Sequence, residues 1–193
     1  RSDLLQQSIF FQDNYNFSGI TKEVRLTTDH TRNPSQHGWY IDLKKPVDDG
    51  NGNISYENEG EQVIVGARFI DNYVYFVTNI SNQDACLTPV EKNFLMVLSA
   101  KSGASLNDVV IDTNEDGTID KTGDNVTFSD GSSHTVSGRT GFGTQLPIII
   151  KTGDVSDDGS EGSVICDVNN KCHKVKSPKK SWTRLSWEEI RTQ

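Results

Sequence analysis

The stretch QVIVGARFIDNYVYFVT, residues 62–78, carries the clearest local structural signal in the sequence. Two runs rich in β-branched and aromatic residues, 62–70 and 73–78, flank the pair Asp71-Asn72. Asp and Asn tolerate the positive φ angles that a tight turn requires, so the stretch predicts a β-hairpin. This hairpin makes an all-β fold the leading expectation.

Similar short runs, separated by turn residues, recur on both sides of the hairpin. Strands are expected at 3–11, 24–27, 38–43, 93–98, 109–111, 125–128 and 146–150. Within 38–43, Trp39, Ile41 and Leu43 alternate onto one face. The polar range 44–60 predicts an exposed insertion loop, and a short helix is expected only at 187–191. Antiparallel strands in a sandwich, a barrel or propeller blades all fit this pattern.

Length and charge restrict the class of protein. The 193 residues suffice for one domain with its own core, or for part of a larger one. The net charge of −8 disfavours nucleic acid as a partner, although the tail 171–193 is locally basic. That tail is expected to be a solvated face, with docking on an acidic partner as the alternative. No apolar run is long enough to predict a transmembrane segment. The first residue is Arg, which suggests a mature chain or an excised fragment.

The three cysteines give an odd count. Cys166 and Cys172 flank a turn-like segment, and a disulfide between them would close a hairpin. A fragment of a zinc site is the alternative, although zinc prefers four ligands at closer pairwise spacing. Cys86 is left over, either as a free thiol or with a partner in missing sequence. A disulfide favours an oxidising, extracytoplasmic setting.

No catalytic constellation is recognisable. The four histidines are scattered among polar residues, without a Gly-x-Ser-x-Gly or His-Glu-x-x-His motif. We therefore expect a protein that is not an enzyme.

The acidic stretch DTNEDGTID, residues 112–120, has the spacing of a calcium-binding loop. Calcium takes about six to eight oxygen ligands, which a short loop supplies at alternate positions. Gly at position 6 permits the sharp turn, and Ile119 at position 8 is expected to face the core. The predicted ligands are the side chains at positions 1, 3, 5 and 9 and the carbonyl at position 7: Asp112, Asn114, Asp116, Asp120 and Thr118.

The loop departs from the EF-hand pattern at position 12, where Gly123 replaces the bidentate Glu. Asp124, one residue later, is a candidate additional ligand within the loop region 112–124. The flanking runs 109–111 and 126–128 resemble strands. We therefore expect a calcium loop mounted between strands, and no helical pair around it.

Several segments, in order, resemble one family. They are RSDLLQQSI at 1–9, GWYIDL at 38–43, VYFVTNI at 74–80 with DAC at 84–86, the range 95–103, the acidic loop, and SWTR at 181–184. Together they resemble the extreme C-terminal portion of PilC/PilY-type pilus-tip adhesins. The ranges 44–60 and 152–180 match weakly, and the pair Cys166/Cys172 has no counterpart in the pattern.

The resemblance implies that residues 1–193 are the last blades of a C-terminal β-propeller, possessing a calcium loop that governs type IV pilus extension and retraction. It also implies twitching motility, virulence, and a location at the pilus tip or bacterial outer surface. Pilins or minor pilins, host or abiotic surfaces and the N-terminal remainder of the protein are the implied partners. Ca²⁺ is the implied cofactor.

Two other functions remain open. One is a structural calcium module of another secreted bacterial surface protein, without any role in pilus motion. The other is a carbohydrate-binding accessory domain that uses Trp39, Tyr40 or Trp182 as an aromatic platform.

Overall fold

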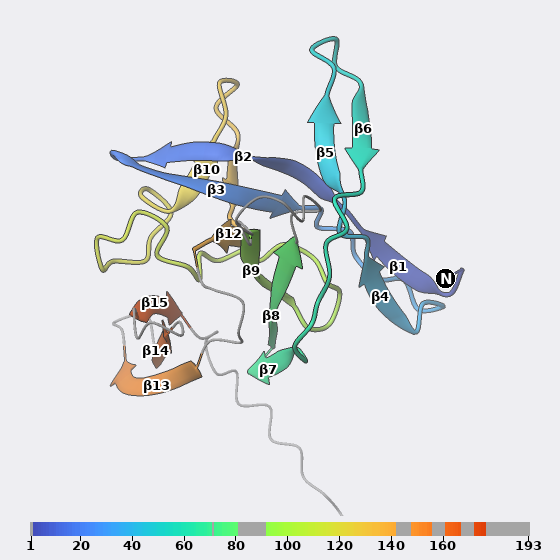
Figure 1. Ribbon diagram of the computed structural model, residues 1–193. Coiled ribbons are helices and arrows are strands. Elements are labelled where there is room, and N and C mark those ends of the chain that lie inside the picture. The colour runs from blue at the N-terminus through green and yellow to red at the C-terminus, as the bar shows by residue number, and fades with distance from the viewer. Residues whose placement is uncertain are drawn as a thin grey trace, which may run out of the picture.

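The computed structural model describes residues 2–70, 72–80, 92–141, 148–155, 161–166 and 172–176. These residues form strands, turns and loops, without any helix (Figure 1). Accordingly, they include no helix long and apolar enough to span a membrane. The all-β prediction is confirmed, and the strands pair antiparallel except for one parallel pair.

A six-stranded antiparallel sheet forms the centre of the molecule (Figure 1). In spatial order its strands are β2 (Ile9–Phe17), β3 (Ile20–Thr27), β12 (Gly138–Thr140), β9 (Lys92–Ser99), β8 (Tyr73–Ile80) and β7 (Arg68–Ile70). Strands β8 and β9 are buried on both faces. Their continuous apolar and β-branched runs suit a strand that is covered on both sides.

Four smaller sheets surround this centre. Their strands are β1 (Leu4–Gln7) with β4 (Gly38–Ile41), in parallel; β5 (Lys45–Asp48) with β6 (Ile54–Glu57); β10 (Asn125–Thr127) with β11 (Ser133–Thr135); and β13 (Ile148–Val155), β14 (Glu161–Cys166) and β15 (Cys172–Lys176) together. Cys166 and Cys172 are joined by a disulfide and lie opposite each other in the β14–β15 register. Cys86 lies outside the described residues.

The side chains of β8 and β9 alternate between the two faces of the sheet, and each face packs into a separate hydrophobic core. One face carries Tyr75, Leu95 and Val97, which pack against Ile111 and Val175. The other face carries Phe76, Phe94 and Met96, and against it pack the half-buried Trp39, Ile41 and Leu43. The predicted common face of these last three residues is confirmed. Period-two alternation therefore places Ile111, directly before the acidic loop, and the 38–43 segment on opposite sides of one sheet.

Three sequence expectations differ from the structure. The range 44–60 contains the exposed hairpin β5–β6, because the Asp- and Gly-rich residues 48–53 form a turn between two pairing segments. The first strand of the predicted 62–78 hairpin shrinks to β7, preceded by a single bridge from Gln62 to Asn79. Residues 109–111 are buried but only Ile111 makes a bridge, to Val175. The helix expected at 187–191 lies outside the described residues.

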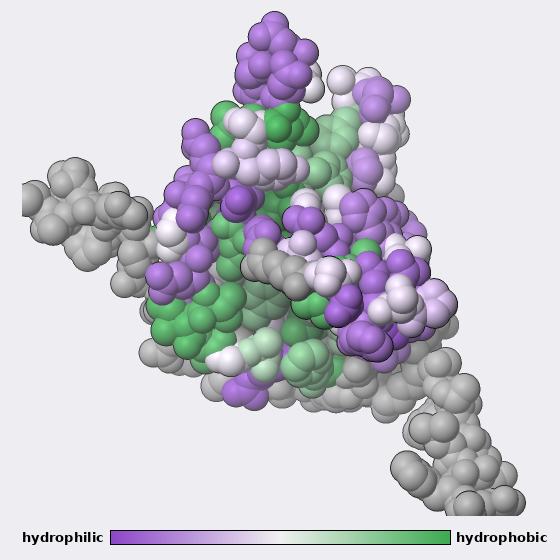
Figure 2. Space-filling model, turned by 90° about the vertical axis from the view of Figure 1, so that its right-hand side faces the viewer, coloured by the Kyte–Doolittle hydropathy of each residue, from purple (hydrophilic) through white to green (hydrophobic). Residues whose placement is uncertain are grey.

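The edge strand β7 leaves apolar side chains in solvent. Phe69 is 69% exposed and Ile64, in the preceding segment, is 68% exposed. Figure 2 shows hydrophilic surface at the protruding upper end of this side of the molecule and apolar surface lower down. An exposed apolar edge of this kind is typical of a surface that another chain or domain covers.

Candidate metal centre

The acidic loop joins the core to the small sheet β10–β11. The residues before it, 109–111, are buried in the central core, and β10 begins directly after it at Asn125. The backbone amide of Asp112 donates to the carbonyl of Lys174 on β15 at 3.4 Å. The loop therefore begins on one sheet and ends on another, in agreement with a strand-mounted setting.

Asp112 occupies the deepest position among the predicted ligands. Its side chain is buried, and its Oδ2 accepts a hydrogen bond from the Gly117 amide at 2.9 Å. Its Oδ1 is buried without a hydrogen-bond partner. Burial raises the pKa of the Asp112 carboxyl, and the charges of Asp124 and Asp116 raise this pKa further, whereas the backbone amides of Gly117 and Glu115 lower it.

Asn114 and Asp116 are linked to each other. The Asn114 side chain accepts from the Asp116 amide at 3.0 Å and donates to Oδ2 of Asp116 at 2.8 Å. Oδ1 of Asp116 in turn accepts from the Thr118 amide at 2.6 Å. Asp116 and Thr118 are exposed, and Ile119 is half-buried. These hydrogen bonds form a tight turn at positions 3 to 7 of the loop. Gly117 lies in this turn and has a φ of +85°.

Asp124 closes the loop from within. Its side chain is fully buried, and its Oδ1 accepts from the amides of Thr113 and Asn114 at 2.6 and 3.2 Å. The Thr113 hydroxyl also donates to Oδ1, and the Asp120 amide donates to Oδ2 at 3.0 Å. Asp124 thus ties position 9 of the loop to positions 2 and 3.

Position 12 of the loop is Gly123, and the neighbouring Asn114 leaves no room there for a side chain. A Cβ at Gly123 would lie 2.5 Å from Nδ2 of Asn114, which is far inside van der Waals contact. The Gly123 amide also donates to Oδ1 of Asp120 at 2.8 Å, beside the Thr122 amide at 2.7 Å. The loop is closed here by backbone, where an EF-hand would place a glutamate.

Arg139 connects the loop to the centre of the six-stranded sheet. It is fully buried on β12, and its Nη1 donates to the carbonyls of Asp112 and Thr113 at 2.9 and 3.4 Å. Its Nη2 lies 3.4 Å from Oε1 of Glu115, which also pairs with Lys22 at 2.9 Å. Burial lowers the pKa of the Arg139 guanidinium, and the charges of Glu115, Asp112 and Asp124 oppose that shift.

Lys174 holds the loop from the other side. Its Nζ donates to the carbonyl of Gly117 at 2.8 Å. Val175, the next residue, is buried in the core beside Ile111. The disulfide-closed hairpin β14–β15 therefore contacts both the first position and the sixth position of the loop.

The donor set suits a hard cation. A buried carboxylate oxygen without a donor is costly, and a cation at that oxygen removes the cost. Carboxylate, amide and carbonyl oxygens are the ligands that calcium prefers. In this conformation, however, Asp116 and Asp120 face solvent. No group of three His, Cys, Asp or Glu side chains within the described ranges is positioned to hold a metal ion. The oxygens at residues 112–120 are of the types that calcium prefers, and Asp112 is the most deeply buried of the acidic residues in this range.

The fold is similar to that in the crystal structure of the Pseudomonas aeruginosa PilY1 C-terminal domain, with a TM-score of 0.64 and 21% sequence identity over 92% of this chain. The chain has a PilY1-type fold. It spans about a third of the length of that PilY1 domain, at 33%. No protein-family model and no curated protein sequence matches the chain.

The structure places three residues around the loop that sequence reasoning missed. Glu115, Arg139 and Lys174 lie outside the spacing of the ligand pattern. Glu115 has a φ of +58°, a left-handed conformation that the sequence pattern does not reveal. A buried arginine beside an acidic loop leaves no trace in the sequence, because the contact joins residues 27 positions apart.

Replacing Arg139 by Met is expected to lower the free energy of unfolding by about 2–3 kcal/mol. The change removes the charged donor from the buried carbonyls of Asp112 and Thr113 while retaining most of the side-chain volume. Urea denaturation followed by circular dichroism measures the loss. Lys22→Met, which removes only the half-buried partner of Glu115, is the control and should cost below about 1 kcal/mol. Equal losses in the two variants would show that Arg139 does not anchor the loop.

Proposed function

We propose that the chain is a calcium-binding, non-catalytic domain of a type IV pilus-associated adhesin. Calcium occupancy of the acidic loop regulates pilus extension and retraction, and with them surface attachment. Two lines of support are independent of each other: the PilY1-type fold, and the ordered ligand spacing at residues 112–120.

One observation carries the calcium assignment above all. Oδ1 of Asp112 is buried without a hydrogen-bond partner, at the first position of the loop. An ionised carboxylate in that place calls for a cation, since burial and the neighbouring Asp116 and Asp124 disfavour its negative charge. A solvated turn of the same composition does not need a buried first Asp.

In this proposal the loop residues have separate tasks. Asp112, Asn114, Asp116, Asp120 and the Thr118 carbonyl hold the ion, and Asp124 positions the loop by accepting hydrogen bonds from its amides. Bound calcium supplies positive charge that offsets the repulsion among these carboxylates. No chemical reaction takes place.

Regulation requires that a conformational change in the loop also changes a surface that a partner contacts. Arg139 links the Asp112 carbonyl to the central sheet, and Lys174 links the Gly117 carbonyl to the hairpin β14–β15. A change in the loop on calcium loss therefore alters contacts on two sheets at once. Loosening of the hairpin changes the surface offered to a pilin or minor pilin.

The wider setting belongs to the same proposal. The chain forms blades of a propeller whose other blades lie in the rest of a longer protein. The blades in the rest of the protein cover the exposed apolar edge at β7, where Phe69 and Ile64 face solvent in this chain. The domain acts outside the cytoplasm, at the pilus tip or bacterial outer surface, where it contacts host or abiotic surfaces.

A structural calcium module is the second candidate function. The observation in its favour is the closure of the loop by Asp124, which accepts four hydrogen bonds from loop residues. A loop that is already closed changes less when calcium binds. In that case calcium stabilises the domain and does not regulate motility.

Bacteria carrying Asp116→Ala in the full-length protein discriminate between the two functions. Asp116 is exposed, so its loss affects the ion and leaves the core intact. Under the main proposal, twitching motility changes at normal surface display and loses its response to calcium chelation. Asp13→Ala, an equal loss of charge on an exposed part of β2, is the control and should behave as wild type. Unaltered motility and calcium response in Asp116→Ala would reject regulation and favour the structural module.

A further inference from the structure

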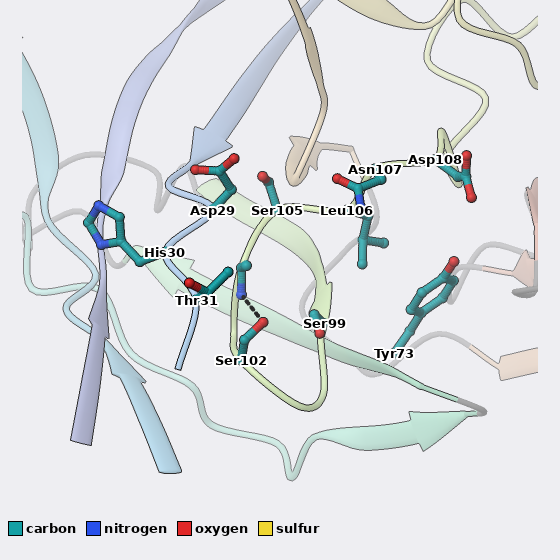
Figure 3. Close-up of a pocket in the computed structure, with 11 residues that line it drawn as sticks. Asp29, His30, Thr31, Tyr73, Ser99, Ser102, Ser105, Leu106, Asn107 and Asp108 are labelled. Atoms are coloured by element: carbon teal, nitrogen blue, oxygen red, sulfur yellow. Dashed lines mark hydrogen bonds between the residues drawn. The ribbon is translucent and has the colours of Figure 1, made fainter. Parts of the chain in front are cut away.

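A hollow of about 380 Å³ lies between the segment after β3, the start of β8 and the loop after β9 (Figure 3). None of its eleven lining residues belongs to the proposed calcium ligands. Its volume falls within the range of about 300–1,000 Å³ that is usual for small-molecule sites.

The two main walls of the hollow are fixed to each other by Gln7. This side chain is fully buried, and its Nε2 donates to the carbonyls of His30 and Ser102 at 2.8 and 3.0 Å. Its Oε1 accepts from the Thr28 hydroxyl at 2.6 Å and from the His30 amide at 3.2 Å. The Ser105 amide adds a bond to the Thr28 carbonyl at 3.0 Å. The hollow is therefore preorganised, which reduces the entropic cost of binding a ligand.

Trp39 supports the same loop from behind. Its Nε1 donates to the Ala100 carbonyl at 3.0 Å. A Cβ at Gly103 would overlap the Trp39 ring, so the loop packs directly against the indole. Trp39 thus packs against the loop, and the side of its ring that faces Gly103 is unavailable as the aromatic platform considered from the sequence. Trp182 lies outside the described residues.

The lining combines polar groups with a small apolar floor. Asp29 and Asn107 are exposed at the hollow, and neither side chain makes a hydrogen bond to the described part of the chain. Figure 3 shows Asp29, Ser105 and Asn107 along one side of the hollow, with Tyr73 at its end. Leu106, between the polar residues, is buried.

The charged residues that line the hollow disfavour anionic ligands. The lining includes two carboxylates, Asp29 and Asp108, and no Lys or Arg. A phosphate, sulfate or acidic sugar would meet repulsion from these carboxylates; among the described residues only Asp108 has a cationic neighbour, Lys121 at 3.9 Å, and Asp29 has none. A neutral ligand with rows of hydroxyl groups meets carboxylate acceptors, an amide and serine hydroxyls.

We propose that this hollow binds a neutral saccharide, with one sugar ring seated between Asp29, Ser105 and Asn107. The carboxylate of Asp29 accepts from sugar hydroxyls, and the Asn107 amide both donates and accepts. The apolar face of the ring lies toward Leu106 and Tyr73, since sugar rings combine hydroxyl edges with apolar faces. The site is separate from the calcium loop, and it does not depend on the proposed calcium function.

The test is an NMR titration of the ¹⁵N-labelled 193-residue chain with five probes. Three are neutral: methyl α-mannoside, methyl β-galactoside and N-acetylglucosamine. Glucosamine is cationic and N-acetylneuraminic acid is anionic. At least one neutral sugar is expected to shift the amide signals of residues 29–31 and 102–108. Asp29→Ala should weaken that binding about tenfold, since a charged hydrogen-bond acceptor is lost. Asn107→Ala is the second variant and should also weaken it.

Asp13→Ala, which removes an equal charge outside the hollow, should bind as wild type does. The amide spectrum of each variant shows directly whether it is folded. Three results would overturn the proposal: no neutral probe shifts these signals, only a charged probe shifts them, or both hollow variants bind a neutral probe as tightly as wild type.

Discussion

Glu61→Gln is expected to lower the free energy of unfolding by about 3–5 kcal/mol. Arg25 is fully buried on β3 of the central sheet, and the Glu61 side chain is only 1% exposed. The carboxylate accepts from both terminal nitrogens of Arg25, at 2.5 and 2.7 Å. Glutamine keeps the shape of the side chain but leaves a buried guanidinium without a counter-charge, which is the costly half of a buried ion pair.

The surroundings of Arg25 do not replace the lost charge. Its Nε donates to Gln12 at 2.8 Å, and its guanidinium lies 3.6 Å from the centre of the Phe94 ring. Both contacts involve neutral partners, so the charge of Arg25 depends on Glu61. Denaturant unfolding followed by circular dichroism measures the effect.

Glu59→Gln provides the matched control for this prediction. Glu59 pairs with Lys45 at 3.7 Å, and both side chains are partly exposed. A pair of this kind contributes about 0–1 kcal/mol. A loss in Glu61→Gln no larger than that in Glu59→Gln would show that the Arg25–Glu61 pair does not stabilise the sheet.

Local sequence signals were sufficient for the strands with continuous apolar runs. Strands β8 and β9 were predicted because buried strands of the central sheet need β-branched and aromatic residues along their whole length. The common face of Trp39, Ile41 and Leu43 followed from alternation alone. The hairpin β5–β6 was not predicted, because both of its strands are polar or exposed and lack the usual pattern.

Charged residues in the core were beyond prediction from a single sequence. Glu61 follows a polar, glycine-rich stretch and would ordinarily be assigned to solvent. Its burial depends on Arg25, which is 36 positions earlier. The propeller arrangement expected from the family resemblance stays a prediction. What the structure shows is one central sheet with smaller sheets around it.

The residue spacing in the acidic loop predicted the candidate ligands but not the residues that hold the loop in place. Position counting gave Asp112 as the first ligand, and the structure places this residue at the buried end of the loop. Counting also suggested Asp124 as a ligand, whereas its carboxylate is engaged by loop amides and the Thr113 hydroxyl. That role depends on how the backbone folds back at Gly123, which the ligand pattern does not encode.

Calcium titration by isothermal calorimetry, on wild type and two ligand variants, tests the metal assignment most directly. The wild-type chain is expected to bind one calcium ion per loop. Asp112→Ala removes the buried carboxylate whose Oδ1 lacks a hydrogen-bond partner, and Asp120→Ala removes the proposed ligand at position 9. Each change should weaken binding about tenfold to a hundredfold, since a charged oxygen ligand is lost. Asp13→Ala, an exposed carboxylate on β2, should leave the affinity unchanged. Calcium affinity that is the same in wild type, Asp112→Ala and Asp120→Ala would contradict the assignment of residues 112–120 as the metal site.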